Sequence, residues 1–246
     1  MEKPRFILFD YGQTLVNELE VSHRRGMEAL LGQAVANPRG LTAEDATEEF
    51  ERALRDIGYD DHLLEPHVYD IWNHVFDRHG LRFERPMKEL ELAYIGATLT
   101  TAPTEGIEEL LRELHRQGIP FGVVSNISHS AACVRHIIGR HLPLDWFRFV
   151  LTSSEQVFRK PHRRIFEAAL ARAGVSVADA LFCGDNPVCD CEGAHGVGMA
   201  SVWYTGAIRN PQTSAPHCPH TVIADWRELP ALWAPEPAAE PVVSLA

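Results

Sequence analysis

The feature that most constrains the fold is a short apolar run near the start of the chain that ends at a single acid. Residues 6–9 (FILF) are too few for a helix, and the Tyr-Gly-Gln sequence after Asp10 is typical of a turn. The pattern predicts a buried strand with Asp10 at its carboxyl end. Ligands bind at that edge of open parallel α/β sheets, because the loops that follow the strands converge there. We therefore expect Asp10 to serve as a nucleophile, a metal ligand or both.

Strand-length apolar runs alternate with amphipathic, helix-length segments from about residue 100 onward. Strands that are joined through helices imply right-handed crossovers and a parallel sheet. We therefore predict an α/β fold, a Rossmann-like parallel sheet with helices on both faces. The apolar runs are residues 121–124, 149–151, 180–183 and 200–203.

The segment between the first strand and this alternation is helical in character, and no convincing strand interrupts it. Since the α/β pattern resumes afterwards, we predict an inserted α-helical cap domain at residues 17–99 and a core domain formed by 1–16 and 100–233. The Pro-, Ala- and Glu-rich residues 234–246 are predicted to be a disordered tail. Helical spacing of apolar residues is found at about 18–36, 42–57, 66–80 and 86–95.

Composition narrows the class of partner. The formal net charge of −11, with no long Lys/Arg run, argues against a nucleic acid or an anionic membrane as the ligand. The five cysteines include no CxxC pair, which favours reduced thiols. The N-terminus enters a strand with no signal peptide ahead of it, and no apolar run has membrane-spanning length. We expect a cytoplasmic protein, a monomer or a homodimer.

Polar side chains follow several of the predicted strands. Phosphoryl transfer requires such a set, because a carboxylate attacks the phosphorus, Mg²⁺ is held by further carboxylates, and a hydroxyl and a lysine bind the phosphate oxygens. Mg²⁺ suits an all-oxygen site of few carboxylates better than Zn²⁺ does. The residues concerned are Asp10, Thr14, Ser125, Lys160, Asp185 and Asp190.

Four short motifs in this order resemble the haloacid dehalogenase superfamily of hydrolases. FDYGQTL stands where that family has its nucleophile strand, VVSN matches the second motif, RKPHRRIF the third and GDNPVCDCEGA the acidic fourth. The helical block at about 17–99 lies where one subgroup of the family carries an α-helical cap between motifs one and two. The resemblance covers nearly the whole chain up to Leu232.

The resemblance implies a nucleophile and a metal site. Asp10 would form an aspartyl-phosphate and also bind Mg²⁺, and Gly12 would offer its backbone carbonyl to the metal. Asp185 would be the principal acidic ligand, with Asp190 contacting the metal through water or through its neighbours.

The resemblance also implies a phosphate site. Lys160 would be catalytic and would bind the phosphoryl group together with Thr14, Ser125 and Asn126. The expected substrate is a small phosphorylated metabolite.

One position departs from the family pattern. Its phosphatases usually carry a second Asp two residues after the nucleophile, as general acid and base, and here that position is Gly12. The loss of such a group typically costs ~10²–10⁴ in rate. His23, His129 or His162 could supply the missing function, and Gln13 could orient water but cannot take a proton.

Three alternatives stay open at this stage. A 2-haloacid dehalogenase also lacks that second Asp, but its chemistry needs no metal and so leaves Asp185 and Asp190 unexplained. A phosphonoacetaldehyde-type hydrolase needs a cap lysine for a Schiff base, and Lys88 is the only lysine of the predicted cap. A catalytically weak member would bind a phosphorylated ligand or a protein partner.

Overall fold

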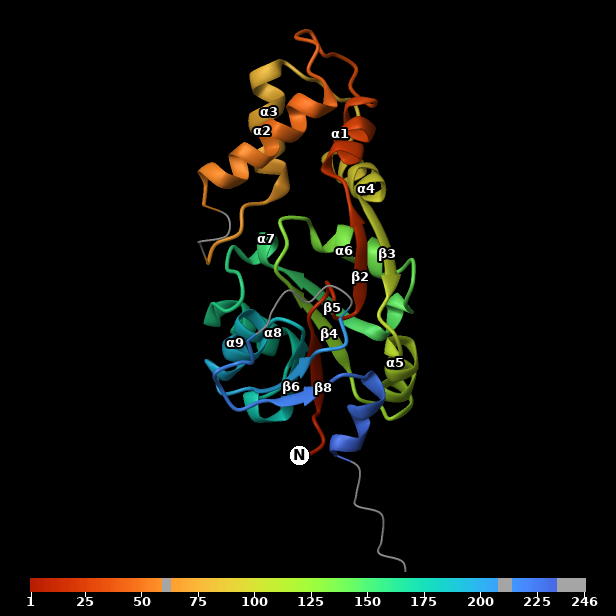
Figure 1. The fold of residues 1–246 in the computed structure, drawn as a ribbon, viewed down its shortest axis with the longest axis vertical. Helices are drawn as coiled ribbons and strands as arrows, with labels where there is room; N and C mark the ends of the chain where they lie inside the picture. Colours follow the sequence, from red (N-terminus) through yellow and green to blue (C-terminus); the bar gives the residue numbers. More distant parts are fainter. Residues whose placement is uncertain (59–62, 208–213, 234–246) are drawn as a thin grey trace, which may run out of the picture.

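A six-stranded parallel sheet forms the lower half of the molecule in Figure 1. The computed structural model describes residues 1–58, 63–207 and 214–233, so the predicted tail at 234–246 lies outside the described residues. The strand order is β5-β4-β1-β6-β7-β8, and the predicted parallel sheet is confirmed. The strands are β1 (Phe6–Phe9), β4 (Phe121–Ser125), β5 (Phe147–Thr152), β6 (Ala180–Gly184), β7 (Ala200–Tyr204) and β8 (Thr221–Ile223).

Strand β1 lies inside the sheet and contributes side chains to both faces. Successive side chains of a strand point in opposite directions, so Ile7 and Phe9 join one apolar cluster while Phe6 and Leu8 join the other. All four are essentially inaccessible to solvent. This burial on both faces explains why the run is continuously apolar rather than alternating.

Helices cover both faces of the sheet, as predicted. The amphipathic helices α5 (Ile107–Arg116) and α6 (Ala131–Ile138) pack in the cluster of Ile7 and Phe9. Helices α8 (Arg163–Ala173) and α9 (Gly193–His195) pack in the opposite cluster. The shorter elements are α7 (Ser153–Gln156), a π-helical turn η3 (Pro187–Glu192) and the 3₁₀ turns η1 (Leu144–Trp146), η2 (Val177–Asp179), η4 (Trp226–Glu228) and η5 (Pro230–Leu232).

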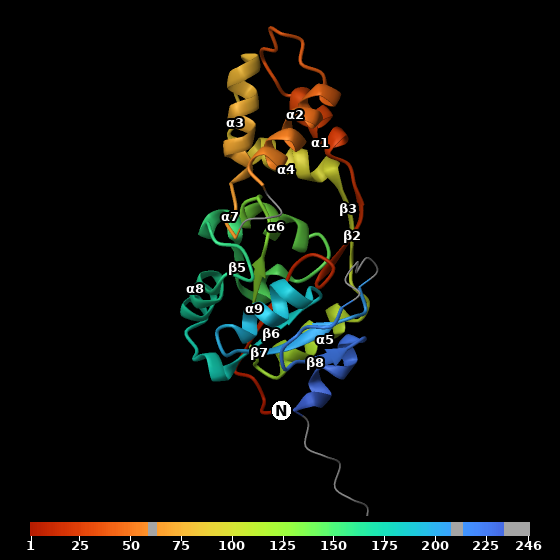
Figure 2. The same ribbon diagram turned by 60° about the vertical axis from the view of Figure 1, so that its left-hand side comes forward.

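Four helices gather at the opposite end of the molecule, above the carboxyl ends of the strands (Figures 1 and 2). We call them the cap helices, and their division from the core at residues 17 and 99 stays a prediction. Gly26 allows α1 to approach α4 closely, since a β-carbon there would lie 2.1 Å from Oγ1 of Thr98. The cap helices are α1 (His23–Leu31), α2 (Ala43–Asp56), α3 (Val68–His79) and α4 (Met87–Thr98).

The prediction of an uninterrupted helical segment after residue 17 is wrong. Strands β2 (Val16–Val21) and β3 (Leu99–Pro103) form an antiparallel ribbon that joins the sheet to the cap helices. Helix α1 begins only after Ser22, whose side chain accepts a hydrogen bond from the backbone N–H of Arg25. The residues of VNELEV do not alternate strictly between polar and apolar, so the local pattern did not distinguish a strand from the helix that we predicted from residue 18, and pairing with β3 makes this segment a strand.

Strand β8 and helix α7 are also absent from the sequence prediction, because three or four residues are too few for a periodic signal.

All five cysteines are free. Among the described residues, no helix is both long and apolar enough to span a membrane.

Candidate active site

The register of the sheet brings three strand ends together around Asp10. Phe9 is paired with Val123 of β4 on one side and with Cys183 of β6 on the other. The backbone N–H of Asp10 donates to the carbonyl of Cys183 at 2.9 Å. Asp10 therefore lies at the carboxyl edge between Ser125, which ends β4, and Asp185, which follows β6.

Lys160 is a buried cation that joins two of the acids. Its Nζ lies 2.5 Å from Oδ1 of Asp10 and 2.7 Å from Oδ1 of Asp190, and the residue is 3% exposed. Burial by itself lowers the pKa of this ammonium group, but the two carboxylates outweigh burial and raise the pKa above its ordinary value. Lys160 is thus positively charged beside the predicted nucleophile.

Three carboxylates surround the point where the strands end. Oxygen atoms of Asp10, Asp185 and Asp190 all lie within 4.8 Å of one another. Gly184 makes this possible, because a β-carbon at that position would lie 2.2 Å from Oδ2 of Asp190. The same Oδ2 accepts the backbone N–H of Asn186 at 2.9 Å, which orients the carboxylate.

The charge of this cluster fits a divalent cation. When all three acids are ionised, three carboxylates face one ammonium group, an excess of two negative charges in a buried place that a cation would offset. Burial first, and then the charges of Asp10 and Asp190, raise the pKa of Asp185 to about 8. An all-oxygen donor set with this excess charge is what Mg²⁺ prefers. Asp10, Asp185 and Asp190 could therefore hold the metal, and Gly12 lines the same cavity.

A cavity of about 500 Å³ opens above these residues. Its floor includes Asp10, Gly12, Ser125, Lys160 and Asp185, so the structure brings most of the predicted site residues to one place. Ser125 is only 2% exposed at this floor. On the opposite side, the cavity wall comes from the cap helices and the β2–β3 ribbon: five of its residues are apolar (Val21, Phe50, Leu54, Ile95 and Leu99), and the others are Glu18, His23 and Thr98.

Two residues predicted to bind phosphate are placed differently. Thr14 is fully buried, does not line the cavity, and donates from Oγ1 to Oδ1 of Asp185 at 3.3 Å. Asn126 lines the cavity, but both ends of its amide bond the backbone of Lys160, at 2.7 and 2.8 Å. We therefore correct their expected roles: Thr14 orients Asp185, and the side chain of Asn126 positions Lys160.

The structure adds a charged group that the sequence did not single out. Arg159 lines the cavity beside Lys160, and its Nε lies 3.2 Å from Oε2 of the buried Glu65. The same oxygen of Glu65 accepts a hydrogen bond from Ser153 at 2.7 Å. Glu65 precedes α3, so a residue between the cap helices orients the loop that carries Lys160. The only signal for Arg159 in the sequence was its position next to Lys160.

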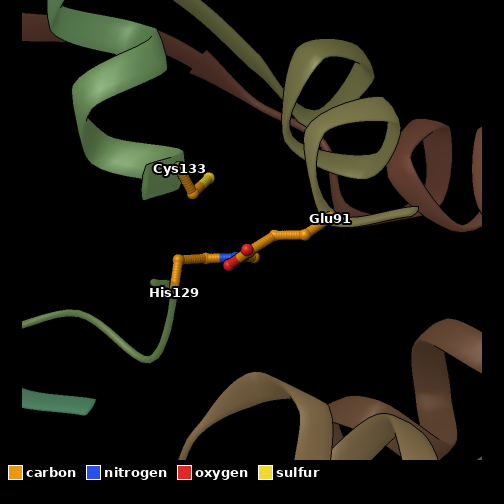
Figure 3. Close-up of side chains that lie close together, drawn as sticks. All are labelled: Glu91, His129 and Cys133. Carbon is orange, nitrogen blue, oxygen red and sulfur yellow. The ribbon is translucent and has the colours of Figure 1, made fainter. Parts of the chain in front are cut away.

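A second buried cluster connects the cap helices to the core (Figure 3). Glu91 of α4 and His129 of the loop after β4 point toward one another, with Cys133 of α6 beside them. Glu91 is completely buried and bonds His129 at 3.0 Å, Ser130 at 2.6 and 2.8 Å, and Tyr69 at 2.7 Å. Burial raises the pKa of the Cys133 thiol, whereas a metal ligand must be a thiolate. We interpret this cluster as a hydrogen-bonded junction rather than a metal site.

Glu91→Gln is expected to destabilise the protein in a pH-dependent way. Burial alone would raise the pKa of Glu91, but hydrogen bonds from His129, Ser130 and Tyr69 outweigh it and lower the pKa from 4.5 to about 2. A lowered folded-state pKa adds stability above pH 4.5 that is lost as the pH falls toward 2. The free energy of unfolding at pH 7 should therefore fall by about 3 kcal/mol.

Urea denaturation at several pH values measures this effect. The difference between wild type and Glu91→Gln should be largest near neutral pH and should shrink between pH 4.5 and 2. Glu89→Gln, at an exposed position on the same helix, is the matched control and should change the free energy of unfolding little at any of these pH values. A constant difference across the whole pH range would contradict the role given to Glu91.

Of the remaining candidate residues, Lys88 and His162 do not join the site. Lys88 is exposed on α4 and does not line the cavity, so the structure gives no support to a Schiff base there. His162 also lies outside the cavity lining, where its Nδ1 accepts the backbone N–H of Arg164 at the start of α8. Gln13 lines the cavity beside Gly12.

Comparison with solved structures identifies similar folds. A 2-haloacid dehalogenase from Pseudomonas syringae pv. Tomato DC3000 superposes with a TM-score of 0.64 at 22% identity, covering 95% of this chain and 100% of that one. At this level of identity the similarity establishes the fold.

Curated relatives match part of the chain. Haloacid dehalogenase-like hydrolase domain-containing protein 3 of Homo sapiens is 36% identical over 102 residues, which is 42% of this chain and 39% of that protein. A phosphoserine phosphatase of Thermus thermophilus is 32% identical over 124 residues, covering 50% of this chain and 47% of that one. The chain thus spans less than half the length of each. A family profile described as haloacid dehalogenase-like hydrolase matches residues 4–198. With that match, and with the motif residues assembled at one edge of the sheet, the chain belongs to the haloacid dehalogenase-like hydrolases.

Proposed function

We propose that this hydrolase is a Mg²⁺-dependent phosphatase of small phosphate esters, with Asp10 as the nucleophile. The observation that carries the proposal is the contact of Asp10 with Lys160 inside a cluster of three carboxylates, at the floor of the cavity. Relatives that are named as phosphatases support the same reaction class.

Each residue of the floor has a distinct task in this reaction. A carboxylate oxygen of Asp10 attacks the phosphorus atom, the bond to the leaving oxygen breaks, and an aspartyl-phosphate forms; water then attacks the phosphorus and releases phosphate. Lys160 neutralises charge on the phosphoryl oxygens, and Ser125 donates a hydrogen bond to them. Mg²⁺, held by Asp10, Asp185 and Asp190, would supply further charge neutralisation.

The wall of the cavity indicates the class of ester. None of the described cap residues on that wall is Lys or Arg, and five are apolar. A second anionic group on the substrate would therefore meet no lysine or arginine from this wall, and Arg159 on the core side already pairs with Glu65. We propose that the substrate is a phosphomonoester whose organic part is apolar and uncharged.

Removal of the metal tests the reaction class. Phosphate release from phenyl phosphate should require Mg²⁺ and stop in EDTA. Mg²⁺ should also raise the melting temperature of the wild type, because it neutralises the carboxylate cluster, and should do so much less in Asp185→Asn. Equal phosphate release with and without EDTA would contradict the proposed metal dependence.

A substrate panel tests the class of ester. We expect kcat/KM for phenyl and hexyl phosphate to exceed that for phosphoglycolate, which carries a second anionic group, by roughly tenfold or more. The reverse order would contradict the assignment of the apolar wall as the specificity surface. Metal-independent chloride release from a 2-haloacid would instead favour the dehalogenase alternative.

A further inference from the structure

Glu18 lies beside the position where this chain lacks an acid. A β-carbon built on Gly12 would have Oε1 of Glu18 as its nearest neighbour at 3.9 Å, with no other described atom within 4 Å outside the adjoining residues. The backbone at Gly12 does not have a positive φ, so its conformation is one that an aspartate adopts. The space that an aspartate at position 12 would enter is thus bordered by a carboxyl group from elsewhere in the chain.

Glu18 also shares a cavity with the reacting groups. Glu18 lines the same cavity as Asp10, Lys160 and Asp185. It is carried by β2 and is paired with Thr101 of β3, so its backbone is held by the ribbon rather than by a loose loop. The turn between Asp10 and β2 is closed by a hydrogen bond from the N–H of Gln13 to the carbonyl of Val16 at 2.8 Å.

The histidines that were candidates for this task have other contacts. Nδ1 of His23 lies 2.8 Å from the hydroxyl of Tyr94, and burial lowers the pKa of His23. His129 bonds Glu91 in the junction described above. His162 is outside the cavity lining. Glu18, by contrast, borders the space at position 12 and lines the cavity above Asp10 and Lys160.

We propose that Glu18 is the general acid and base of this enzyme, in place of the absent acid at position 12. The proposal rests on the proposed phosphatase function. As the bond from phosphorus to the leaving oxygen breaks, that oxygen takes the proton of the Glu18 carboxylic acid, which becomes a carboxylate. The carboxylate then accepts a proton from water while the water oxygen attacks the aspartyl-phosphate. Asp10 is released, phosphate departs, and Glu18 is again protonated.

The longer side chain explains how the site functions with glycine at position 12. A glutamate extends one methylene further than an aspartate, so a carboxyl carried by the neighbouring strand can reach the space that the family fills from the nucleophile loop. An aspartate at position 12 would find that space open, apart from the Glu18 carboxyl itself. The two positions are therefore alternative sources of one proton-transferring group.

Glu18→Gln tests the proposal, because glutamine keeps the shape of the side chain but cannot transfer a proton. With hexyl phosphate, whose alkoxide needs a proton to leave, kcat should fall ~10²–10³-fold. With 4-nitrophenyl phosphate, the first step needs little protonation, so the variant should release a burst of one nitrophenol per enzyme and then stall. Mass spectrometry should find the phosphoryl group retained on Asp10.

Two further variants complete the test. Gly12→Asp combined with Glu18→Gln should recover at least ~10-fold of the lost kcat on hexyl phosphate, a rescue that a purely structural role of Glu18 would not give. Glu20→Gln is the matched control, because Glu20 is an exposed glutamate on the same strand that pairs with Arg25 at 3.0 Å. It should leave both reactions unchanged.

The outcomes separate this proposal from the proposed function. If Glu18→Gln hydrolyses hexyl phosphate as fast as the wild type, with no burst on the aryl ester, Glu18 is not the acid and base although the phosphatase assignment stands. If neither the wild type nor Gly12→Asp releases phosphate from any ester of the panel, the proposed function is wrong and the role of Glu18 falls with it.

Discussion

Replacing Asp10 with asparagine is expected to lower phosphate release by ~10⁴-fold or more, since removal of a catalytic nucleophile has effects of this order. Asparagine occupies the same volume but does not attack phosphorus. The reaction of the wild type should pass through a phosphorylated protein, whereas the variant should show no gain in mass. Steady-state phosphate release and intact-mass analysis with acetyl phosphate and Mg²⁺ measure both effects.

The control for this variant is an aspartate at the opposite edge of the sheet. Asp145 is exposed just before β5, at the amino end of that strand, so Asp145→Asn should retain wild-type turnover. Circular dichroism of Asp10→Asn should match that of the wild type. Full Mg²⁺-dependent turnover by Asp10→Asn would disprove the mechanism, because it would show that Asp10 is not needed as the nucleophile.

Lys160→Met is expected to impair both stability and activity. The substitution leaves Asp10 and Asp190 buried without their cation, and breaking a buried ion pair on one side costs about 3–5 kcal/mol. The free energy of unfolding in EDTA should fall by about that amount. Loss of a charge that stabilises the phosphoryl group should also lower kcat ~10²–10³-fold. Urea denaturation and steady-state kinetics measure the two effects.

Mg²⁺ provides an internal check on this explanation. Because the metal binds the same carboxylates, it should restore part of the stability of Lys160→Met while leaving kcat low. Lys88→Met removes an exposed lysine and should change neither quantity. If Lys160→Met were as stable as the wild type in EDTA, the buried cation would not be what offsets the charge of Asp10 and Asp190.

Much of the site was predictable because its residues lie where apolar, strand-length runs of the sequence end. Asp10, Ser125 and Asp185 each end or follow a buried apolar run, and the carboxyl ends of parallel strands meet at one edge. Lys160 was identifiable from the third motif of the family. The bonds between these residues follow from the strand register, which the sequence pattern indicates only in part.

Glu18 was not predictable by the same reasoning. The apolar residues that follow it suggested a helix from residue 18, whereas the strand it occupies is stabilised by pairing with residues about 80 positions later. Such pairing depends on tertiary contacts that override local propensity. The contacts of Thr14 and Asn126 were missed for a similar reason, because their partners Asp185 and Lys160 are distant in the chain.

The ribbon of β2 and β3 allows the cap helices to be exchanged as one unit. The backbone N–H of Ser22 donates to the carbonyl of Thr98 at 2.9 Å, so the two points at which the chain enters and leaves the cap helices are one hydrogen bond apart. An insertion whose ends are adjacent can be replaced by another of different length with little disturbance of its host. Recombination at Ser22 and Thr98 would give chimeras that keep Asp10, Glu18 and Lys160 while receiving new cap helices in place of those that carry Phe50, Leu54 and Ile95.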